Sequence, residues 1–343
     1  MTIQFDDDPY DLPEIFLTLG LTLVDQGKGS AVHDLVNETL AKHHGDPLFA
    51  QLAQFILTRS VPHYHAQMLA DGPRNIAYAQ AITAAAKGRV VLDIGTGSGL
   101  LAMMAARAGA TRVIACEANP VLAETARAII DANGYSDIVE VHACHSGMLD
   151  RAFVGDGVDM VVSEIFSADL LEEGVLRSLE QARAELCAPG ALFIPETASL
   201  RVALADHPAP DLPIGNVEGF DLSPFAAHVN TAGHFEQNDA KLVLRSEPAD
   251  LATFDFAFDR PLEAEGRTKV ILRSTGGKVR GVAQWLRIGF GAGNVYENGP
   301  GAHEAAHWSI LHHPFTTPRE LPAGSQQKIE AWYCGDRLVI WPN

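Results

Sequence analysis

Cysteine is scarce in this sequence, with four residues among 343, and no two of them form a C-x-x-C pair. Such sparse thiols argue against a disulfide framework or a cysteine-based zinc site, and they are typical of reduced cytosolic proteins. Apolar runs of about 18 residues, which a transmembrane helix needs, are also missing. The first residues, MTIQFDDDPYDLP, are acidic where a secretory signal would be basic and apolar. These absences predict a cytoplasmic protein.

Basic residues are outnumbered, because 25 Lys and Arg face 43 Asp and Glu, for a formal net charge of −18. An acidic surface repels nucleic-acid phosphates and anionic lipid headgroups and attracts cationic partners. We therefore expect neither nucleic acid nor membrane as a partner. The pairs His63/His65 and His312/His313 have no carboxylate or cysteine at ligand spacing, so no metal site is expected. The length suits about two domains.

Residues 1–60 carry helical periodicity without a strand signal and predict a small helical N-terminal extension. Ser30 is expected to cap a second helix, and Asp46 a third that begins at Pro47. On this third helix Leu48, Leu52, Phe55 and Ile56 are expected to face inward. Short amphipathic helices of this kind resemble part of a tetratricopeptide unit, although no second copy follows at a period of about 34 residues. A helical cap on the next domain is the alternative.

Residues 61–196 alternate between apolar strand patterns and helical patterns, which predicts an α/β, Rossmann-like domain with a doubly wound parallel sheet. The expected strands are 89–94, 113–117, 138–143, 158–163 and 191–194. From residue 197 to 343 the helical pattern fades, and short strands alternate with Gly, Pro and Asp turns. This pattern of short strands and turns predicts an antiparallel β-barrel domain.

A glycine-rich turn, Asp93-Ile-Gly95-Thr-Gly97-Ser-Gly99, joins the first expected strand to a helix. Glycines there let the backbone approach a ligand at the edge where doubly wound sheets bind theirs. A dinucleotide fingerprint would need glycine where Leu100 stands. Methyltransferases that use S-adenosylmethionine have the Asp-x-Gly-x-Gly-x-Gly form. We interpret Asp93, Gly95 and Gly97 as cofactor-binding residues.

Glu117 ends the second expected strand. A carboxylate in this position can accept both ribose hydroxyls of an adenosine. The alternative, a solvated acid at the end of a strand, is less favoured beside the glycine-rich turn. Glu117 therefore joins the predicted cofactor site.

Glu164 and Glu173 stand at the two ends of a mostly apolar stretch that follows the fourth expected strand. A guanidinium keeps its charge and presents a planar fork of N–H donors. Two carboxylates can hold that fork and aim one nitrogen at a sulfonium methyl group. Solvated acids at a helix start are the alternative for Glu172 and Glu173, but not for the strand-end Glu164. The stretch resembles the double-glutamate loop of the protein arginine methyltransferase family.

Three further segments resemble that family, and the likeness extends over residues 61–343. Residues 63–75 are similar to its helix before the Rossmann-like domain, which implies that His65 and Arg74 contact the cofactor, the arginine through the methionyl carboxylate. Residues 186–195 are similar to its turn into the fifth strand. His307-Trp308 looks like its Thr-His-Trp loop, which closes the acceptor site.

The resemblance implies a class I methyltransferase that uses S-adenosylmethionine and no metal. The nearest branch is the mono-methylating type III branch, which shares Phe166 and an acid–leucine pair at Asp169-Leu170, and has a similar adenine-side segment around Ser146. The site residues implied are Glu164, Glu173 and His307 as catalytic, His65, Arg74, Asp93, Gly95, Gly97, Glu117 and Ser146 for the cofactor, and Tyr64, Met68, Phe166, Asp169 and Trp308 for the substrate.

Several positions depart from the family pattern. Ser167 replaces an acid of the type III branch, Gly147 the acid that binds the adenine amino group, and Ala306 the threonine before His307. The second, degenerate catalytic module of that branch does not fit in this length. These departures concern the substrate and the product state. The expected acceptor is arginine in a protein or peptide; the alternatives are free arginine or another small guanidino compound in a biosynthetic pathway, and, least favoured, a non-catalytic binding module.

Family members of this length pair head to tail through an arm of the β domain, which implies a homodimer here. Residues 217–230 have the right location, with Ser223 as an expected N-cap and Phe220, Leu222 and Phe225 as an apolar patch. The alternative is that these residues cover one end of the barrel.

Overall fold

A computed structural model describes residues 12–59, 61, 64–208, 215–228, 233–257, 261–302 and 306–342. The chain divides into two compact units that interleave along the sequence. Unit 1 contains Met1–Ala70, Tyr78–Glu164 and Gln181–Ile194, and unit 2 contains Asp71–Ala77, Ile165–Glu180 and Pro195–Asn343. The expected domain limits at residues 60 and 196 stay a prediction. Within the described ranges, no helix is long and apolar enough to cross a membrane.

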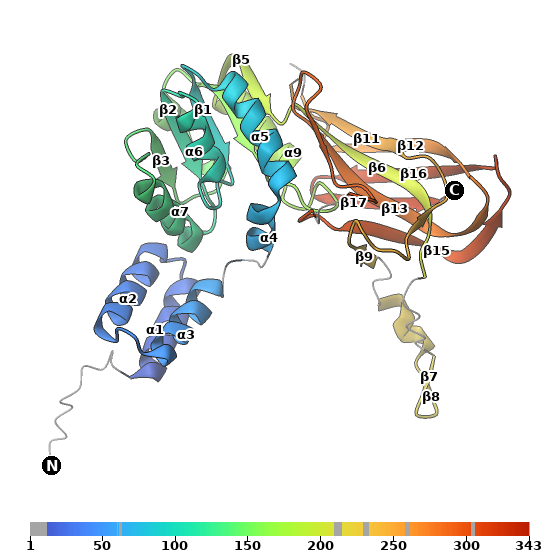
Figure 1. Cartoon of the computed structure of the whole chain (residues 1–343), viewed down its shortest axis with the longest axis horizontal. Helices are drawn as coiled ribbons and strands as arrows, with labels where there is room; N and C mark the ends of the chain where they lie inside the picture. The colour runs from blue at the N-terminus through green and yellow to red at the C-terminus, as the bar shows by residue number, and fades with distance from the viewer. Residues whose placement is uncertain are drawn as a thin grey trace. The chain divides into compact units, whose positions relative to one another are not determined.

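Unit 1 is built on a five-stranded parallel sheet with the strand order β3-β2-β1-β4-β5 (Figure 1). Its strands are β1 (Val90–Ile94), β2 (Arg112–Cys116), β3 (Val139–His142), β4 (Val158–Ser163) and β5 (Cys187–Ile194). Nearly every residue of β1, β2 and β4 is buried, as in parallel strands covered on both faces. The strand order changes direction at β1, as in doubly wound folds. The expected Rossmann-like class is confirmed.

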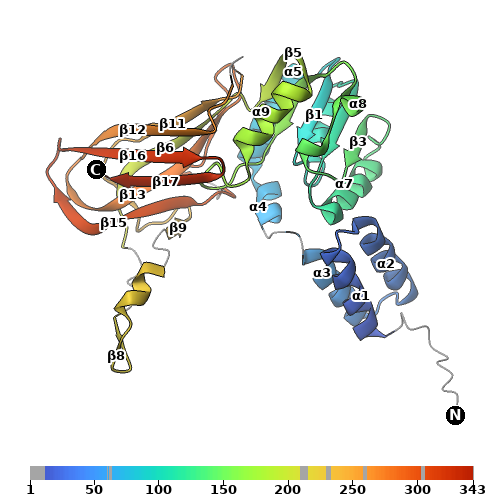
Figure 2. The same cartoon turned by 180° about the vertical axis from the view of Figure 1, so that it is seen from behind.

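Helices cover both faces of this sheet: α6 lies in front of it in Figure 1, and α8 lies on the side seen in Figure 2. The helices are α4 (Tyr64–Ala70), α5 (Gly72–Ala85), α6 (Leu100–Arg107), α7 (Pro120–Ala132), α8 (Arg151–Val154) and α9 (Val175–Glu185), with a 3-10 turn η2 (Ser146–Met148). The start of α7 follows from its sequence, because the Asn119 side chain accepts hydrogen bonds from two backbone amides and Pro120 fixes the first turn.

Three N-terminal helices, α1 (Pro13–Asp25), α2 (Gly29–Lys42) and α3 (Pro47–Thr58), pack as a small bundle within unit 1. Their shared core includes Val121 of α7, so the bundle is attached to the Rossmann-like domain. Asp46 caps α3 as predicted, since its carboxylate accepts a hydrogen bond from the Leu48 amide at 2.8 Å.

Two expectations for this bundle are wrong. Helix α2 begins at Gly29 with Lys28 in the N-cap position, not Ser30. Gly29 lies so close to α7 that a Cβ there would meet the Pro120 carbonyl oxygen at 2.0 Å, and the missing side chain permits this approach. Leu48 is 50% and Phe55 54% exposed, although both were expected to face inward, because α3 buries the stripe of Phe49, Ala53 and Ile56 instead.

Unit 2 is built mainly from antiparallel sheets. Seven strands form the larger one: β6 (Thr197–Asp206), β9 (Gly233–Phe235), β10 (Val243–Leu244), β11 (Ala249–Asp255), β13 (Gly277–Gly289), β14 (Val295–Glu297) and β15 (Ile310–Leu321). Three form the smaller one: β12 (Glu265–Arg273), β16 (Gln326–Cys334) and β17 (Arg337–Pro342). Side chains of both sheets meet in one apolar core, including Val202, Val282 and Ile329. The antiparallel strands predicted for residues 197–343 are confirmed, and their closure into a barrel stays a prediction.

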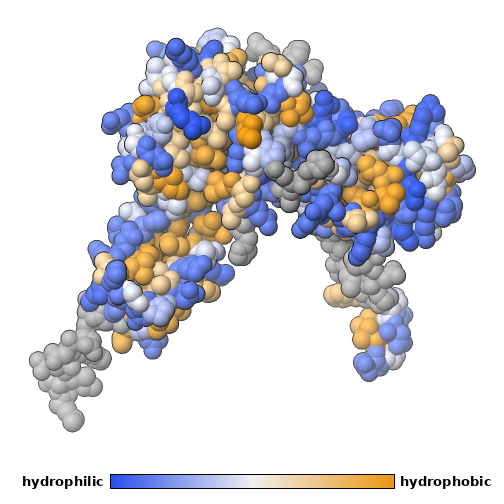
Figure 3. Space-filling model, viewed as in Figure 1, coloured by the Kyte–Doolittle hydropathy of each residue, from blue (hydrophilic) through white to orange (hydrophobic). Residues whose placement is uncertain are grey.

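Residues 215–228 form a small hairpin, β7 (Asn216–Val217) and β8 (Phe220–Asp221), followed by a 3-10 helix η3 (Ser223–His228). Phe220 is 72% and Phe225 60% exposed, so the segment carries hydrophobic surface, seen at the β7–β8 hairpin in Figure 3. Residues 229 and 230 of the predicted arm lie outside the described residues.

Candidate functional site

Three strand ends of the parallel sheet come together in register. Ile94 of β1 stands opposite Cys116 of β2 on one side and Ser163 of β4 on the other. Because the strands are parallel, the residues that follow them leave the sheet at the same edge. Gly95, Glu117 and Glu164 are the next residues, so this edge gathers three of the predicted site positions.

The glycine loop, residues 95–99, needs its glycines. Gly95, Gly97 and Gly99 have φ values of 71°, 56° and 82°, a region that other residues rarely adopt. The amides of Gly95 and Thr96 donate to the carbonyl of Cys116 at 3.0 Å, and Thr96 Oγ1 donates to the buried Asp93 carboxylate at 2.6 Å. Asp93 therefore shapes this loop.

Glu117 is held by the backbone on both sides of its carboxylate. Gly97 N donates to Oε2 at 3.0 Å, and Asn119 N donates to Oε1 at 2.9 Å. The carboxylate thus has a set orientation beside the glycine loop. Each of its oxygens has further lone-pair capacity for a ligand hydroxyl.

His65 lies over the glycine loop, since a Cβ on Gly97 would be 3.9 Å from its ring. Burial lowers the pKa of His65, while the nearby carboxylates of Glu117 and Glu164 oppose this shift. Tyr64 stacks on the ring at a centroid distance of 4.6 Å, and Met68 lies one turn further along the same helix, α4. The structure therefore brings His65, the loop, Glu117 and Glu164 together.

Ser146 lies in η2 and is 3% exposed. Its hydroxyl has no hydrogen-bond partner among the described residues. A buried hydroxyl without a partner is unfavourable, so this position suits a ligand that supplies one. Burial raises the pKa of the Cys116 thiol to about 12, so this thiol stays protonated near neutral pH.

The glutamate loop, residues 165–174, is organised by Asp169. Its Oδ1 accepts hydrogen bonds from the Ser167 hydroxyl at 2.5 Å, the Leu171 amide at 2.9 Å and the Glu172 amide at 3.1 Å. Leu170, fully buried, has a φ of 81°, which is unusual for a side chain of this kind. Asp169 thus stabilises a strained turn, a role that the sequence did not suggest, and Glu173 is exposed at the end of the loop.

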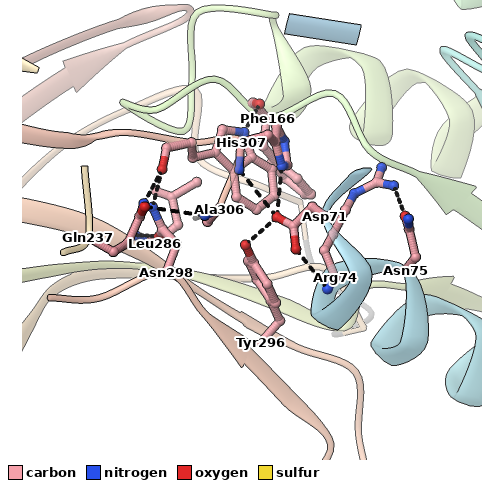
Figure 4. Close-up of polar contacts among 11 residues, drawn as sticks. Asp71, Arg74, Asn75, Phe166, Gln237, Leu286, Tyr296, Asn298, Ala306 and His307 are labelled. Atoms are coloured by element: carbon pink, nitrogen blue, oxygen red, sulfur yellow. Dashed lines mark hydrogen bonds and ion pairs between the residues drawn. The ribbon is translucent and has the colours of Figure 1, made fainter. Parts of the chain in front are cut away.

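The predicted His-Trp pair contacts this loop. The buried indole of Trp308 donates to the Phe166 carbonyl at 2.6 Å, and the two rings meet edge to face. The Trp308 carbonyl accepts from the side chains of Gln237 at 2.6 Å and Asn298 at 2.9 Å (Figure 4). The pair is therefore held from both sides within unit 2.

Asp71 is the functional candidate that sequence reasoning missed. Its Oδ2 accepts from the Tyr296 hydroxyl at 2.5 Å and from His307, at Nδ1 (3.1 Å) and at the backbone amide (3.3 Å) (Figure 4). Burial raises the pKa of Asp71, but the hydrogen bonds from His307, Tyr296 and Arg74 outweigh it and lower the pKa. An ionised Asp71 requires the hydrogen of His307 on Nδ1. The only signal was its place inside the segment 63–75.

Arg74 lies in unit 2, on the first turn of α5. It is 2% exposed, its amide donates to Asp71 Oδ1 at 3.1 Å, and its Nη1 donates to the Asn75 side chain at 2.8 Å (Figure 4). Unit 2 thus contains Asp71, Arg74, Phe166, Asp169, Glu173, His307 and Trp308, and unit 1 contains the other predicted positions, from Tyr64 to Glu164. In the described part of the chain, no group of three or more His, Cys, Asp or Glu residues could hold a metal ion.

Comparisons with known proteins agree on methyl transfer. Residues 79–195 match the family model of ribosomal protein L11 methyltransferase. The chain is 39% identical over 282 residues to an arginine N(omega)-methyltransferase of Streptomyces achromogenes subsp. streptozoticus, covering 80% of this chain and 76% of that one. It is 32% identical over 254 residues to a probable protein arginine N-methyltransferase 3 of Arabidopsis thaliana, covering 68% and 42%, respectively.

Solved structures share the fold. One is the Trypanosoma brucei PRMT1 enzyme–prozyme heterotetrameric complex with AdoHcy, with a TM-score of 0.73 at 24% identity over 82% of this chain and 93% of that chain. Another is protein arginine methyltransferase 10 of Arabidopsis thaliana, with a TM-score of 0.69 at 21% identity. This match covers 84% of this chain and 98% of that chain. At these identities the likeness concerns the fold.

Proposed function

The chain belongs to the arginine N-methyltransferase family, and from this we propose that it transfers the methyl group of S-adenosylmethionine to a guanidino nitrogen of arginine in a protein or peptide. One observation carries the proposal: the glycine loop, Glu117 and Glu164 leave one edge of the parallel sheet together. A cofactor loop and a strand-end carboxylate at the same edge put an acceptor-binding group beside the methyl donor.

The residues of unit 1 fit S-adenosylmethionine. Glu117, oriented by the amides of Gly97 and Asn119, accepts the ribose hydroxyls, and Ser146 offers its hydroxyl on the adenine side. Asp93 shapes the loop, and Gly95 leaves its backbone open to the methionyl part. His65 covers the loop in its neutral form. When bound, S-adenosylmethionine supplies an electrophilic methyl group on a sulfonium ion.

The acceptor is held by carboxylates. Glu164 and Glu173 bind the guanidinium fork through charge-assisted hydrogen bonds and turn one nitrogen toward the donor. Such bonds keep electron density on that nitrogen, and a carboxylate is present to take the proton that it loses. Arg74 binds the methionyl carboxylate, which leaves the glutamates for the acceptor.

His307 and Trp308 close the acceptor side. Asp71 sets the His307 tautomer, and the Trp308 indole holds the Phe166 carbonyl, so the His-Trp pair and the glutamate loop form one connected structure within unit 2. Tyr64, Met68, Phe166 and Asp169 are the proposed substrate-binding residues.

A second acceptor is supported by a specific observation. The Streptomyces relative, which is similar over 80% of this chain, has arginine itself in its name, as an arginine N(omega)-methyltransferase. In addition, Ser167 stands where the type III branch has an acid that would select basic neighbours of a target arginine. Free arginine is therefore the alternative acceptor.

A labelled-methyl transfer assay distinguishes the two. Purified protein is given free L-arginine or an arginine-rich peptide at matched arginine concentration, and the products are separated by mass. Transfer to the peptide with a kcat/KM at least about tenfold higher than for the amino acid supports the peptide acceptor. The reverse ratio assigns free arginine, and transfer to neither contradicts the proposal. The same spectra count the methyl groups on each arginine.

We also propose a homodimer formed through the arm at residues 217–230, because Phe220, Leu222 and Phe225 in its described part are exposed and favour a covered position. A cytoplasmic location stays a prediction that cell fractionation would test.

A further inference from the structure

Gln284 is a fully buried amide in the central strand of the seven-stranded sheet. On β13 it stands opposite Val202 of β6 and Leu311 of β15, and Val202 and the nearby Val282 belong to the apolar core. A primary amide in such surroundings costs free energy unless its donor and acceptor are both paired. Its two partners therefore indicate why a polar residue stands there.

The first partner is the glutamate loop. Nε2 of Gln284 donates to the Ala168 carbonyl at 3.2 Å. A carbonyl can only accept, so this contact fixes which end of the amide faces the loop. Oε1 is left for the second partner, His313, at 2.8 Å from its Nε2.

His313 must then carry its hydrogen on Nε2, because Oε1 is an acceptor. Burial lowers the pKa of His313 to about 4, against the opposing charge of Asp169, while nearby His234 lowers it further. The ring is therefore neutral near neutral pH, with one N–H that can only serve Gln284. The hydrogen bonds run in one direction, from His313 through Gln284 to Ala168.

The loop that receives this bond has a conformation that requires support. Leu170 adopts a φ of 81°, and strained residues of this kind persist where the surroundings hold them. Two carbonyls on either side of Ser167 are held by side chains of the β-rich part of unit 2: Phe166 by Trp308 and Ala168 by Gln284. Glu173 follows Leu170 by three residues, so its position depends on this turn.

We propose that Gln284 is a positioning residue of the methyl transfer: it holds the Ala168 carbonyl, with its amide fixed by His313, and thereby keeps the glutamate loop in the conformation that presents Glu173. The catalytic consequence rests on the proposed function. The structural part, support of the loop, does not.

The test replaces Gln284 with a side chain of similar length that lacks both hydrogen-bonding groups, Gln284→Met. Ser246→Ala is the control, because the Ser246 hydroxyl is also buried in unit 2 and accepts from Leu204 N at 2.9 Å without touching the loop. In Gln284→Met we expect amide exchange of the peptide spanning residues 166–174 to quicken about tenfold, since the loop opens more often. We expect kcat to fall about tenfold while the dissociation constant of S-adenosylhomocysteine stays within about twofold. Ser246→Ala should show neither effect.

Variants of His313 test whether the hydrogen bonds run from His313 through Gln284 to Ala168. His313→Gln keeps an N–H donor for Gln284 and should retain the exchange protection and kcat of the wild type. His313→Leu removes the donor. It should therefore show the same changes as Gln284→Met, faster amide exchange of residues 166–174 and a lower kcat, but to a smaller extent.

Loop exchange in Gln284→Met equal to that in Ser246→Ala would overturn the proposal. So would losses of kcat and of S-adenosylhomocysteine affinity in equal proportion, because a general weakening of the fold predicts that result. A wild type that methylates no arginine acceptor would contradict the proposed function, and the exchange measurement would still decide whether Gln284 supports the loop.

Discussion

At the scale of single residues, the three glutamates at the two ends of the glutamate loop differ in their surroundings. Glu164 is half-buried at a strand end, and Glu172 and Glu173 are exposed. Asp169 raises the pKa of Glu172 by its charge and is the largest of several causes, with burial second. The neighbours Glu172 and Glu173 therefore allow a matched comparison of two acids, of which only the second is assigned to the acceptor.

We expect Glu164→Gln and Glu173→Gln each to lose at least tenfold in turnover while they keep their fold and cofactor affinity. An amide in place of a carboxylate removes a charge-assisted bond to the guanidinium, worth roughly 1.5–3 kcal/mol, or about tenfold in rate or more. Turnover is measured beside calorimetric titration with S-adenosylhomocysteine. Glu172→Gln is the control and should stay near the wild type; similar losses in Glu172→Gln and Glu173→Gln would remove Glu173 from the site.

His312 predicts a pH dependence of stability. It is fully buried, neither ring nitrogen has a partner among the described residues, and burial, with the charges of His207 and His313, lowers its pKa to about 4. The unfolded chain takes up the proton near pH 6.5 and the folded chain only near 4, so stability is present above about 6.5 and is lost as the pH falls toward 4.

We therefore expect the free energy of unfolding, measured with urea, to fall between about pH 7.5 and about pH 5, with His312 contributing roughly 2 kcal/mol of that fall. His312→Leu, of similar volume, should flatten the dependence by that amount. Asp71 does not interfere, because its lowered pKa places its loss of stabilisation below 3.8. Parallel pH curves for the wild type and His312→Leu would contradict the assignment.

At the scale of elements, the N-terminal bundle supports the start of α7. Gly29 packs against the Pro120 carbonyl, and the His33 ring contacts the Val121 carbonyl at 3.1 Å. The residue before Pro120 is Asn119, whose amide holds Glu117. The bundle is thus connected through one helix end to a predicted ribose-binding carboxylate.

Gly29→Ala should disturb this contact, because its Cβ would come within 2.0 Å of the Pro120 oxygen. We expect a loss of roughly 1–3 kcal/mol in the free energy of unfolding, the usual cost of overpacking, together with weaker S-adenosylhomocysteine binding. Ser30→Ala, at the exposed next position of α2, is the control. If Gly29→Ala lowers the stability but leaves the affinity for S-adenosylhomocysteine unchanged, the predicted link between the bundle and the cofactor site is wrong.

At the scale of the whole molecule, the proposed homodimer depends on the arm. Phe220→Ser together with Phe225→Ser should convert a dimer into a monomer, because these two rings provide the most exposed apolar surface of the arm. Size exclusion with light scattering measures the mass. Val339→Ser, an exposed apolar residue of β17, is the control. A monomeric wild type would contradict the proposed dimer and the role of the arm in it.

The net charge of −18 favours cationic acceptors at a distance. Raising the ionic strength from about 0.1 M to about 1 M shortens the screening length from about 10 Å to about 3 Å. We expect the KM for an arginine-rich peptide to rise several-fold, with kcat unchanged, and the KM for a peptide with a single arginine to change less. Equal changes for both peptides would indicate that only local contacts hold the acceptor.

The parts of the site that sequence predicted lie where local rules apply. A parallel sheet brings its strand ends to one edge, so the register needed to gather Gly95, Glu117 and Glu164 follows from the strand pattern alone. Asp46 at the start of α3 is likewise a local capping signal. The prediction that Ser30 caps α2 was wrong, because the helix begins at Gly29. This start depends on the contact of Gly29 with α7, which lies far along the chain.

What the sequence by itself determined is therefore the Rossmann-like class and the place of the glycine loop, Glu117 and Glu164 at one edge of its sheet, since each depends on spacing within one element or on the order of elements. The roles of these residues stay predictions. The tertiary structure decided how those groups are supported: Asp71 meets Tyr296 and His307, and Gln284 meets Ala168 and His313. These contacts join residues far apart in the chain, and a buried Asp or Gln carries no periodic signal of its partner. The physical reason is that hydrogen-bond pairing in a closed core is set by which strands pack together, and no single segment contains that information.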